Sequence, residues 1–436
     1  MTTTLVWQKT ENTKTADANI QAFLADRDIE LDRALLPFDI QATIAHVKGL
    51  NRIDLLEDDE CASLCVALDD LARAFESGEF ILDNRFEDGH SAIEWCLCEK
   101  LGEVGKKVHL GRSRNDQVQA AMRLYMLDEL KSITKFVCEL AAAFLTRAER
   151  EQMTPIPGYT HLQRAVPSTV GLWLAAFAES FVDHAEVIKF TTRWINTSPL
   201  GTAAGYGVNL PLDREGVAQD LAFDRLQINP MYAQNSRGQF EFQTLAALWQ
   251  VMQTIRRFAW DVSLYTSAEF DFVRLPDELT TGSSIMPNKR NPDVVEFLRG
   301  SAAIISGCMT EIQQIISLPS GYHRDLQLVK EPTMRAITTA RRTITITLQV
   351  IKALEFNRKK MRAAIDSTMY ATDRAVELAI AGTPFRDAYR QVSSELNQLT
   401  KRSPEESVNA RTSPGACADL QLEELQARLT NMQTIS

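Results

Sequence analysis

Apolar residues in the middle of the chain recur with helical spacing. Residues 115–154 contain neither glycine nor proline, and their apolar positions follow steps of four and three: Met126, Leu130, Ile133, Val137, Leu140 and Phe144. Such spacing places the apolar side chains on one face of a helix, where they pack against other helices. At about 1.5 Å per residue, uninterrupted segments of this kind reach on the order of 40 to 55 Å. The pattern therefore predicts a long helix.

Four further segments have the same character. Residues 172–198 and 239–275 also lack both helix breakers, and residues 292–318 carry small residues that would let a partner helix approach closely. Residues 333–381 predict another long helix, with a bend near 355–357. Within it, residues 343–348 read TITITL, an alternating β-branched pattern that locally favours a strand. We predict a helix there, because the flanks are helical and a lone strand would have no partner.

The pattern before and after these long segments is shorter. Residues 26–46, 50–75 and 93–101 show brief helical periodicity, and glycine and proline interrupt the tail beyond residue 360. The sequence therefore predicts an all-α protein with a small N-terminal helical domain (1–110), a central long-helix bundle (111–359) and a small C-terminal helical domain (360–436). Long helices with several apolar faces also predict a bundle shared between subunits.

Charge and cysteine content narrow the possibilities. The 436 residues carry a net charge of −10, with a pI near 5.3, which argues against nucleic-acid binding. The seven cysteines match neither a disulfide framework nor a zinc site, so we expect free thiols in a reducing compartment. The N-terminus lacks signal-peptide features, and no segment is apolar enough to span a membrane. We therefore expect a cytoplasmic protein.

The most distinctive polar stretch is residues 280–293, TTGSSIMPNKRNPD. Gly282 and two serines precede the cations Lys289 and Arg290, and we predict a helix with Asn291 as its N-cap and Pro292 as its first residue. Hydroxyls, a lysine and loop N–H groups before a helix N-terminus attract carboxylates or phosphates. The alternative is a polar, capped surface loop.

Three other stretches combine chemically active side chains. Residues 111–117, GRSRNDQ, place arginines and amides at a helix start, which suits anion recognition or simply an arginine-rich cap. Residues 157–169 form an irregular segment around His161, and a lone histidine is more often structural than catalytic. Residues 320–331 read SGYHRDLQLVKE. No histidine and acid spacing fits a metal site, and no phosphate-loop glycine pattern appears, so we expect neither metal nor cofactor.

These motifs resemble known families. GSSIMPNKRNP is similar to the signature loop of the fumarase/aspartase superfamily, and GRSRNDQ, preceded by EDGHSAIE, resembles the argininosuccinate lyase family and its δ-crystallin relatives. The resemblance implies a homotetramer around a core of about twenty helices, about five from each chain, with active sites shared between subunits. It also implies the elimination of fumarate from argininosuccinate, a small-molecule substrate, to give arginine. An inactive crystallin-like homologue and a sibling such as adenylosuccinate lyase remain the alternatives.

The resemblance also implies residue roles. Ser283 would remove the proton, and His161, supported by Glu296, would serve the leaving group, although the sequence leaves open which is base and which is acid. Lys289 would stabilise the charge that develops. The substrate-binding positions would be Asp28, Ser113, Arg114, Asn115, Thr160, Gln163, Arg237, Asn291, Tyr322, Gln327 and Lys330.

Asp28 departs from the pattern of this family. Many relatives carry a substrate-binding serine here, whereas an aspartate could pair with the α-ammonium of the arginine half. The alternative is that Asp28 caps a helix beginning near Ile29. The signature loop departs too, because it reads MPNKRN where the family more often has MPQKKN.

Overall fold

The computed structural model describes residues 20, 23, 27–400 and 402–434, and this part of the chain is mostly helical. Its strands form four two-stranded sheets. The chain divides into two compact units. Unit 1 comprises Met1–Lys131, Lys189–Ala246 and Ser306–Thr338, and unit 2 comprises Ser132–Ile188, Ala247–Ile305 and Thr339–Ser436. The all-α prediction is confirmed, whereas the division into three domains at residues 110 and 359 stays a prediction.

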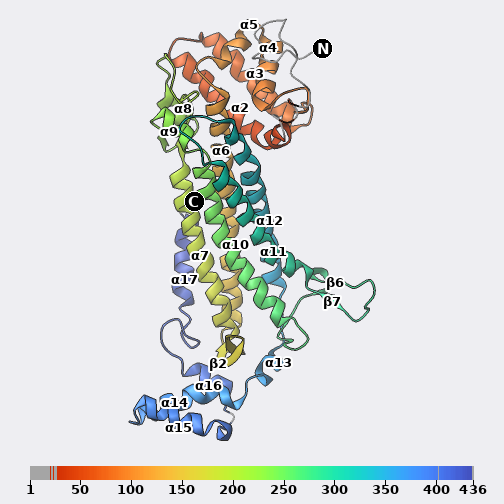
Figure 1. Cartoon of the computed structure of the whole chain (residues 1–436), viewed down its shortest axis with the longest axis vertical. Helices are drawn as coiled ribbons and strands as arrows, with labels where there is room; N and C mark the ends of the chain where they lie inside the picture. The colour runs from red at the N-terminus through yellow and green to blue at the C-terminus, as the bar shows by residue number, and fades with distance from the viewer. Residues whose placement is uncertain (1–19, 21–22, 24–26, 401, 435–436) are drawn as a thin grey trace. The chain divides into compact units, whose positions relative to one another are not determined.

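The five predicted long helices are all present, and each contributes residues to both units. They are α6 (Arg114–Arg150), α7 (Val170–Ile195), α10 (Gln239–Tyr265), α11 (Asp293–Ile315) and α12 (Lys330–Ala353). Figure 1 shows them as the long coiled ribbons of the chain. The alternating residues 343–348 lie inside α12, so the helical prediction for them was correct.

Two predicted helix ends were wrong, for a shared reason. Helix α10 stops at Tyr265 rather than continuing to residue 275, and the bend expected near 355–357 is a complete break after α12. Strand β5 (Val273–Arg274) follows α10, strand β8 (Glu355–Phe356) follows α12, and the two strands pair antiparallel. A pairing between residues so far apart in the chain leaves no signal in helical periodicity.

In unit 1, the helices that precede α6 pack around an apolar core. They are α2 (Asp28–Arg52), α3 (Asp58–Glu76), α4 (Gly89–Leu101), α5 (Glu103–Lys106) and η1 (Lys107–His109). Leu64, Leu68 and Leu71 recur on one face of α3 and are buried against α2 and α4. Asp88 caps α4 by accepting a hydrogen bond from the Ser91 N–H at 2.7 Å.

The remaining elements of unit 1 are short. They are the parallel strands β3 (Thr197–Ser198) and β4 (Arg225–Leu226), the helices α8 (Arg214–Asp220) and α9 (Pro230–Asn235), and η3 (Arg324–Val329). Leu200, Val217, Leu221 and Phe223 share a buried cluster with Ala120 of α6. This cluster packs the first turns of α6 against the loop that follows β3.

In unit 2, aromatic side chains fill the space between the long helices. The ring of Phe144 on α6 lies 5.4 Å from that of Phe181 on α7 and 5.0 Å from that of Phe258 on α10. Trp173 stacks on Phe258 and donates a hydrogen bond from its indole to Asp261 at 2.9 Å. Such ring pairs contribute beyond the burial of their area, so they fix these helix parts relative to one another.

The rest of unit 2 consists of short strands and helices. They are β1 (Pro155–Thr160), β2 (Gln163–Thr169), η2 (Asp277–Leu279), β6 (Thr281–Gly282), β7 (Arg290–Asn291), α13 (Arg358–Ala363), η4 (Ser367–Tyr370), α14 (Ala371–Ile380), α15 (Phe385–Ser394), η5 (Leu396–Gln398), α16 (Pro404–Asn409) and α17 (Leu422–Thr434). The segment around His161, expected to be irregular, is an antiparallel hairpin of β1 and β2. No helix in the described residues could cross a membrane.

Candidate active site

His161 lies at the tip of the β1–β2 hairpin in unit 2. Thr160 pairs with Gln163, which leaves His161 and Leu162 as a two-residue turn. Both have positive φ, at 53° and 58°, as a type I′ turn requires. Neither is a glycine or asparagine, the residues that adopt this conformation most easily, so the turn is strained. The four residues from Thr160 to Gln163 are exposed, and the imidazole therefore faces outward.

The body of this hairpin is braced by the C-terminal part of unit 2. Arg164 Nη1 donates to Asp366 Oδ2 at 2.7 Å. The ring of Tyr159 meets that of Phe270 edge-on at 5.6 Å. Both strands also contact α16, and β1 contacts α13. The hairpin thus holds His161 on a supported strand pair rather than on a free loop.

Ser283 begins the loop between β6 and β7, which Figure 1 shows extending away from α11. Its Oγ accepts hydrogen bonds from the backbone N–H of Met286 at 3.1 Å and of Ile285 at 3.4 Å. These donors would stabilise negative charge on Oγ, as an alkoxide base needs. The half-buried serine sits beside an exposed loop, so it can be reached from solvent.

The end of this loop differs in detail from the sequence prediction. Helix α11 begins at Asp293, and Asn291 belongs to β7, where it pairs with Thr281. Asn291 is therefore not the N-cap, and Pro292 is not the first helical residue. The pairing of β6 with β7, which helical periodicity does not reveal, keeps Asn291 in a strand. The helix therefore begins only after Pro292. Arg290 forms an ion pair with Asp277.

Lys289 and Glu296 are both exposed side chains of unit 2. Glu296 Oε1 lies 3.5 Å from Arg299 Nη2, one helical turn along α11. The described contacts of the single chain do not join Glu296 to His161, so that pairing stays a prediction. The guanidinium of Arg299 also lies over the Trp260 ring at 4.1 Å.

The other predicted residues gather in unit 1 around a pocket of about 170 Å³. Seven of them line it: Asp28, Arg114, Asn115, Arg237, Tyr322, Gln327 and Lys330. The sequence prediction missed several charged residues that share the lining: Asp32, Glu87, Asp88, His90 and Arg324. The EDGHSAIE motif contains Glu87, Asp88 and His90. It contributed to the family resemblance, but none of its residues was predicted to belong to the site.

Arg114 and Lys330 are each held by two carboxylates in this pocket. Arg114 Nη1 lies 3.0 Å from Glu87 and 2.9 Å from Asp88. Lys330 Nζ lies 2.8 Å from Asp28 and 2.7 Å from Asp32, with only 6% of its side chain exposed. Burial alone would lower the pKa of Lys330, but the two carboxylates outweigh it and raise the pKa. Both cations stay charged and fixed in position.

The contacts of Asp28 exclude one of its two interpretations. Helix α2 begins at Asp28 itself, its N-cap is Arg27, and no side chain caps it. The carboxylate points instead to Lys330, and Gln327 Nε2 donates to it at 3.3 Å. The capping alternative was therefore wrong, because the buried lysine provides a stronger partner than a helix N–H.

His90 adds a histidine that the sequence prediction did not use. Its Nδ1 lies 2.5 Å from Asp39 Oδ2. Burial acts to lower the pKa of His90, but Asp39 and Asp88 more than offset it, and the pKa is raised. Asp39 thus orients the ring at the wall of the pocket, and the carboxylates favour its protonated form.

Ser113 and Asp116 shape the turn that carries Arg114 and Asn115. The Ser113 N–H donates to Asp116 Oδ1 at 2.9 Å, and Ser113 Oγ accepts from the Asn115 N–H at 3.3 Å. Asp116 is fully buried, and its other oxygen accepts from the Gly201 N–H. Part of the motif therefore has a structural role, because it holds the turn together through hydrogen bonds. Ser113 itself does not line the pocket.

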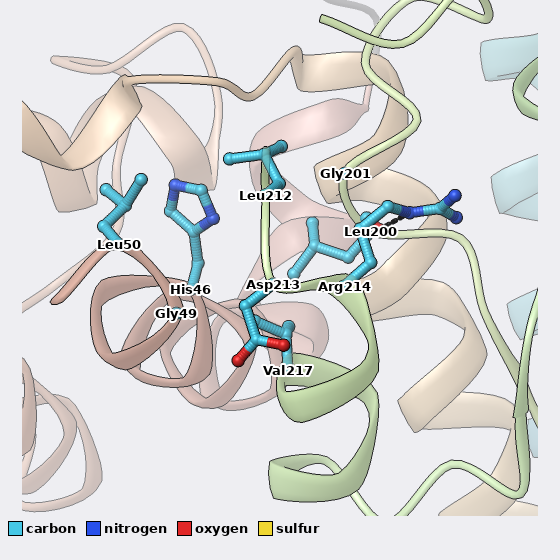
Figure 2. A pocket seen from close by; sticks show the side chains of 9 residues that line it. All are labelled: His46, Gly49, Leu50, Leu200, Gly201, Leu212, Asp213, Arg214 and Val217. Carbon is cyan, nitrogen blue, oxygen red and sulfur yellow. Dashed lines mark hydrogen bonds between the residues drawn. The ribbon is translucent and has the colours of Figure 1, made fainter. Parts of the chain in front are cut away.

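A smaller pocket in unit 1 offers no second candidate. Figure 2 shows that His46, Leu50 and Leu212 surround it, beside Arg214, whose Nε donates to the Leu200 carbonyl at 3.1 Å. It encloses about 10 Å³, roughly the space of one water. In the described part of the chain, no three histidine, cysteine, aspartate or glutamate side chains are arranged to hold a metal.

Comparisons with known proteins define the class. The family described as "Lyase" matches residues 11–307. A crystal structure of EDDS lyase in complex with formate superposes with a TM-score of 0.79 at 23% identity, covering 97% of this chain and 92% of that one. The long-helix fold and the family match together define a lyase of the fumarase/aspartase superfamily.

Two curated relatives narrow this class. An argininosuccinate lyase of Stenotrophomonas maltophilia (strain R551-3) is 51% identical over 425 residues, which cover 97% of this chain and 98% of the relative. One of Xanthomonas campestris pv. campestris (strain B100) is 50% identical over 432 residues, covering 99% and 100%. The chain belongs to the argininosuccinate lyase family. The family and fold expected from the motifs are thereby confirmed.

Proposed function

We propose that this protein eliminates fumarate from argininosuccinate and releases arginine. The observation that carries the proposal is the identity of 51% to an argininosuccinate lyase over 97% of the chain. The intact serine loop and the charged pocket of unit 1 support it, because an inactive structural homologue would need neither. A small substrate that carries carboxylate, ammonium and guanidinium groups also suits a pocket lined by both signs of charge.

In the proposed reaction, Ser283 removes a proton from the succinyl carbon next to a carboxylate. The electron pair of the C–H bond moves into that carboxylate and gives a doubly charged aci-carboxylate, which Lys289, Asn291 and loop N–H groups stabilise. The C–N bond then breaks, its electron pair goes to the guanidino nitrogen, and this nitrogen takes up a proton. His161, supported by Glu296, serves this leaving-group side. The two N–H donors on Ser283 Oγ support the choice of base.

Substrate binding is divided between two groups of residues in this proposal. Thr160 and Gln163 flank the histidine and hold the succinyl half, together with Asn291. Residues that line the pocket of unit 1 hold the arginine half: Arg114, Asn115, Arg237, Tyr322, Gln327 and Lys330. Ser113 supports them through the turn that carries Arg114 and Asn115. Arg114 and Lys330 are already fixed by carboxylates, which supports a preformed pocket.

We further infer a homotetramer whose active sites combine residues of different subunits. Large apolar side chains on three long helices support this assembly, because Phe190, Trp260 and Phe297 are 56%, 48% and 79% exposed in the single chain. Packing between chains would remove this apolar area from water. Each site would take GRSRNDQ, the His161 hairpin and the serine loop from three chains. A cytoplasmic location is supported by seven cysteines that form no disulfide.

The test is turnover of argininosuccinate by the purified protein, followed as fumarate by its ultraviolet absorbance. Ser283→Ala should abolish turnover and leave the melting temperature unchanged, because the loop hydroxyl contributes little to stability. Ser284→Ala is the matched control and should stay active. A wild-type protein that releases fumarate from adenylosuccinate but not from argininosuccinate would refute the proposed function. A fully active Ser283→Ala variant would refute the assignment of Ser283 as the base.

A further inference from the structure

Two cations in the pocket of unit 1 each face a pair of carboxylates. Lys330 faces the two carboxylates of Asp28 and Asp32, and Arg114 faces those of Glu87 and Asp88. Each cation therefore carries one carboxylate more than it neutralises. Burial raises the pKa of Asp28, Lys330 lowers it, and the neighbouring Asp32 and Asp88 raise it further, to a net rise. A ligand cation beside Asp28 would relieve this repulsion.

The two carboxylates on Lys330 are not equally occupied. Asp32 uses Oδ1 for Lys330 and Oδ2 for the Gly89 N–H, at 2.7 and 2.8 Å, and is 5% exposed. Asp28 uses Oδ1 for Lys330, whereas the one donor to its Oδ2 among the described residues is Gln327 Nε2, at 3.3 Å. Asp28 Oδ2 therefore has the weaker existing partner and is the oxygen better placed to accept a further donor.

Two buried polar atoms at the same pocket lack a partner among the described residues. One is the acceptor Gln327 Oε1, and the other is the donor Arg237 Nη1. Arg237 is 5% exposed, and its Nη2 donates to the Leu326 carbonyl at 3.2 Å. Unsatisfied buried groups are costly, so their presence at one cavity points to a ligand that pairs with them.

These atoms match an α-amino acid head group. An ammonium would donate to Asp28 Oδ2 and Gln327 Oε1, and a carboxylate would accept from Arg237 Nη1. Resting on the proposed function, we infer that Asp28 is a specificity-determining residue that recognises the α-ammonium of the arginine half. A serine at this position would offer a neutral acceptor, so this chain should depend on the ammonium more strongly than a serine-bearing relative does.

A second role for Asp28 has to be separated from this one. The carboxylate could act only by holding Lys330, in which case its loss would weaken every ligand of the pocket alike. Recognition of the ammonium instead makes its loss selective. The ratio of two affinities, for arginine and for the analogue in which a hydroxyl replaces the α-ammonium, distinguishes the roles.

The experiment measures both dissociation constants by calorimetry on the purified full chain. Wild type should bind arginine about tenfold or more tightly than the 2-hydroxy acid analogue, the ratio expected for a charge-assisted contact. In Asp28→Asn the ratio should fall to within about twofold of unity, chiefly through weaker arginine binding. Asp32→Asn is the matched control: it removes the other carboxylate from Lys330 and should leave the ratio near the wild-type value.

Thermal melting identifies variants that fail to fold, and Asp28→Ser replaces Asp28→Asn if the amide is not tolerated. An unchanged ratio in the folded Asp28 variant would overturn the inference, and so would an equal fall in Asp32→Asn. Turnover of argininosuccinate by wild type is measured on the same preparation. Normal turnover with an unchanged ratio refutes only the role of Asp28, whereas absent turnover refutes the proposed function whatever the ratio.

Discussion

Asp116 allows a quantitative test of how the GRSRNDQ motif is held. Its carboxylate is fully buried and accepts three backbone hydrogen bonds. The Ser113 N–H donates to Oδ1, and those of Gly201 and Ala203 donate to Oδ2, each at 2.9 Å. One side chain thus joins the start of α6 to the loop after β3. That start carries Arg114 and Asn115 into the pocket of unit 1.

Asp116→Asn keeps the shape and removes one acceptor. In the more favourable orientation of the asparagine side chain, the amide oxygen still accepts from the N–H groups of Gly201 and Ala203. The NH₂ group of the side chain then faces the Ser113 N–H, which loses its acceptor. An orphaned buried donor costs about 1–3 kcal/mol, and the two remaining bonds lose their charge assistance at about 1 kcal/mol each. Relief from burying a charge offsets part of this sum. We expect a net loss of about 2–4 kcal/mol, or a fall of roughly 2–4 °C in melting temperature for a chain of 436 residues.

The assay is thermal unfolding followed by circular dichroism, together with the KM for argininosuccinate, which should rise as the Arg114 turn loosens. Asp69→Asn is the matched control, because it makes the same chemical change at an exposed position of α3 and should alter stability by less than about 0.5 kcal/mol. An Asp116→Asn protein that melts together with the control would refute the reasoning.

Three further predictions concern assembly, the hairpin and pH. Tetramers reassembled from inactive His161→Asn and Ser283→Ala subunits should regain activity; hybrids verified by mass that stay inactive would contradict shared sites. Asp366→Asn removes an exposed ion pair worth about 0.2–1 kcal/mol, so kcat should fall severalfold while melting changes little; unchanged kcat would show that Arg164 does not position the hairpin. Burial and Arg112 lower the pKa of His109 to about 4. Between pH 6.5 and 4, His109 therefore takes up a proton only in the unfolded chain. The melting temperature should fall as the pH is lowered through this range, and it should fall less steeply in His109→Asn.

Helical periodicity predicted what depends on neighbours along the chain. The five long helices follow from apolar spacing, and α12 forms despite the strand-like residues 343–348, because the helical flanks outweigh a local β preference. The ends that failed depend on distant partners. Helix α10 ends shortly before β5, which pairs with β8. Asp271, with φ of 46°, turns the chain between α10 and β5. Neither fact is encoded within one window of sequence.

The charged residues of the site also show that contacts between distant parts of the chain cannot be predicted from local sequence. Motif resemblance found seven lining residues of the pocket, because each lies in a recognisable string. Asp32 was not among the predicted site residues, because its partners, Lys330 and the backbone N–H of Gly89, lie far from it in the chain. The sequence could say that Asp28 was unusual but not what it touches. The capping alternative was reasonable for an aspartate near a helix start, and it failed because a buried cation lies within 2.8 Å.

The turn that carries His161 shows why local preference and function conflict at one position. A two-residue hairpin turn favours Asn-Gly, since both residues need positive φ, yet here they are His161 and Leu162. Left-handed backbone costs about 1–2 kcal/mol per residue. Glycine would remove that cost but also the imidazole. The strand pairing and the Arg164–Asp366 bridge therefore have to hold the turn in place. Strain kept at an exposed tip, where a glycine would be more stable, is itself an argument that the ring acts there.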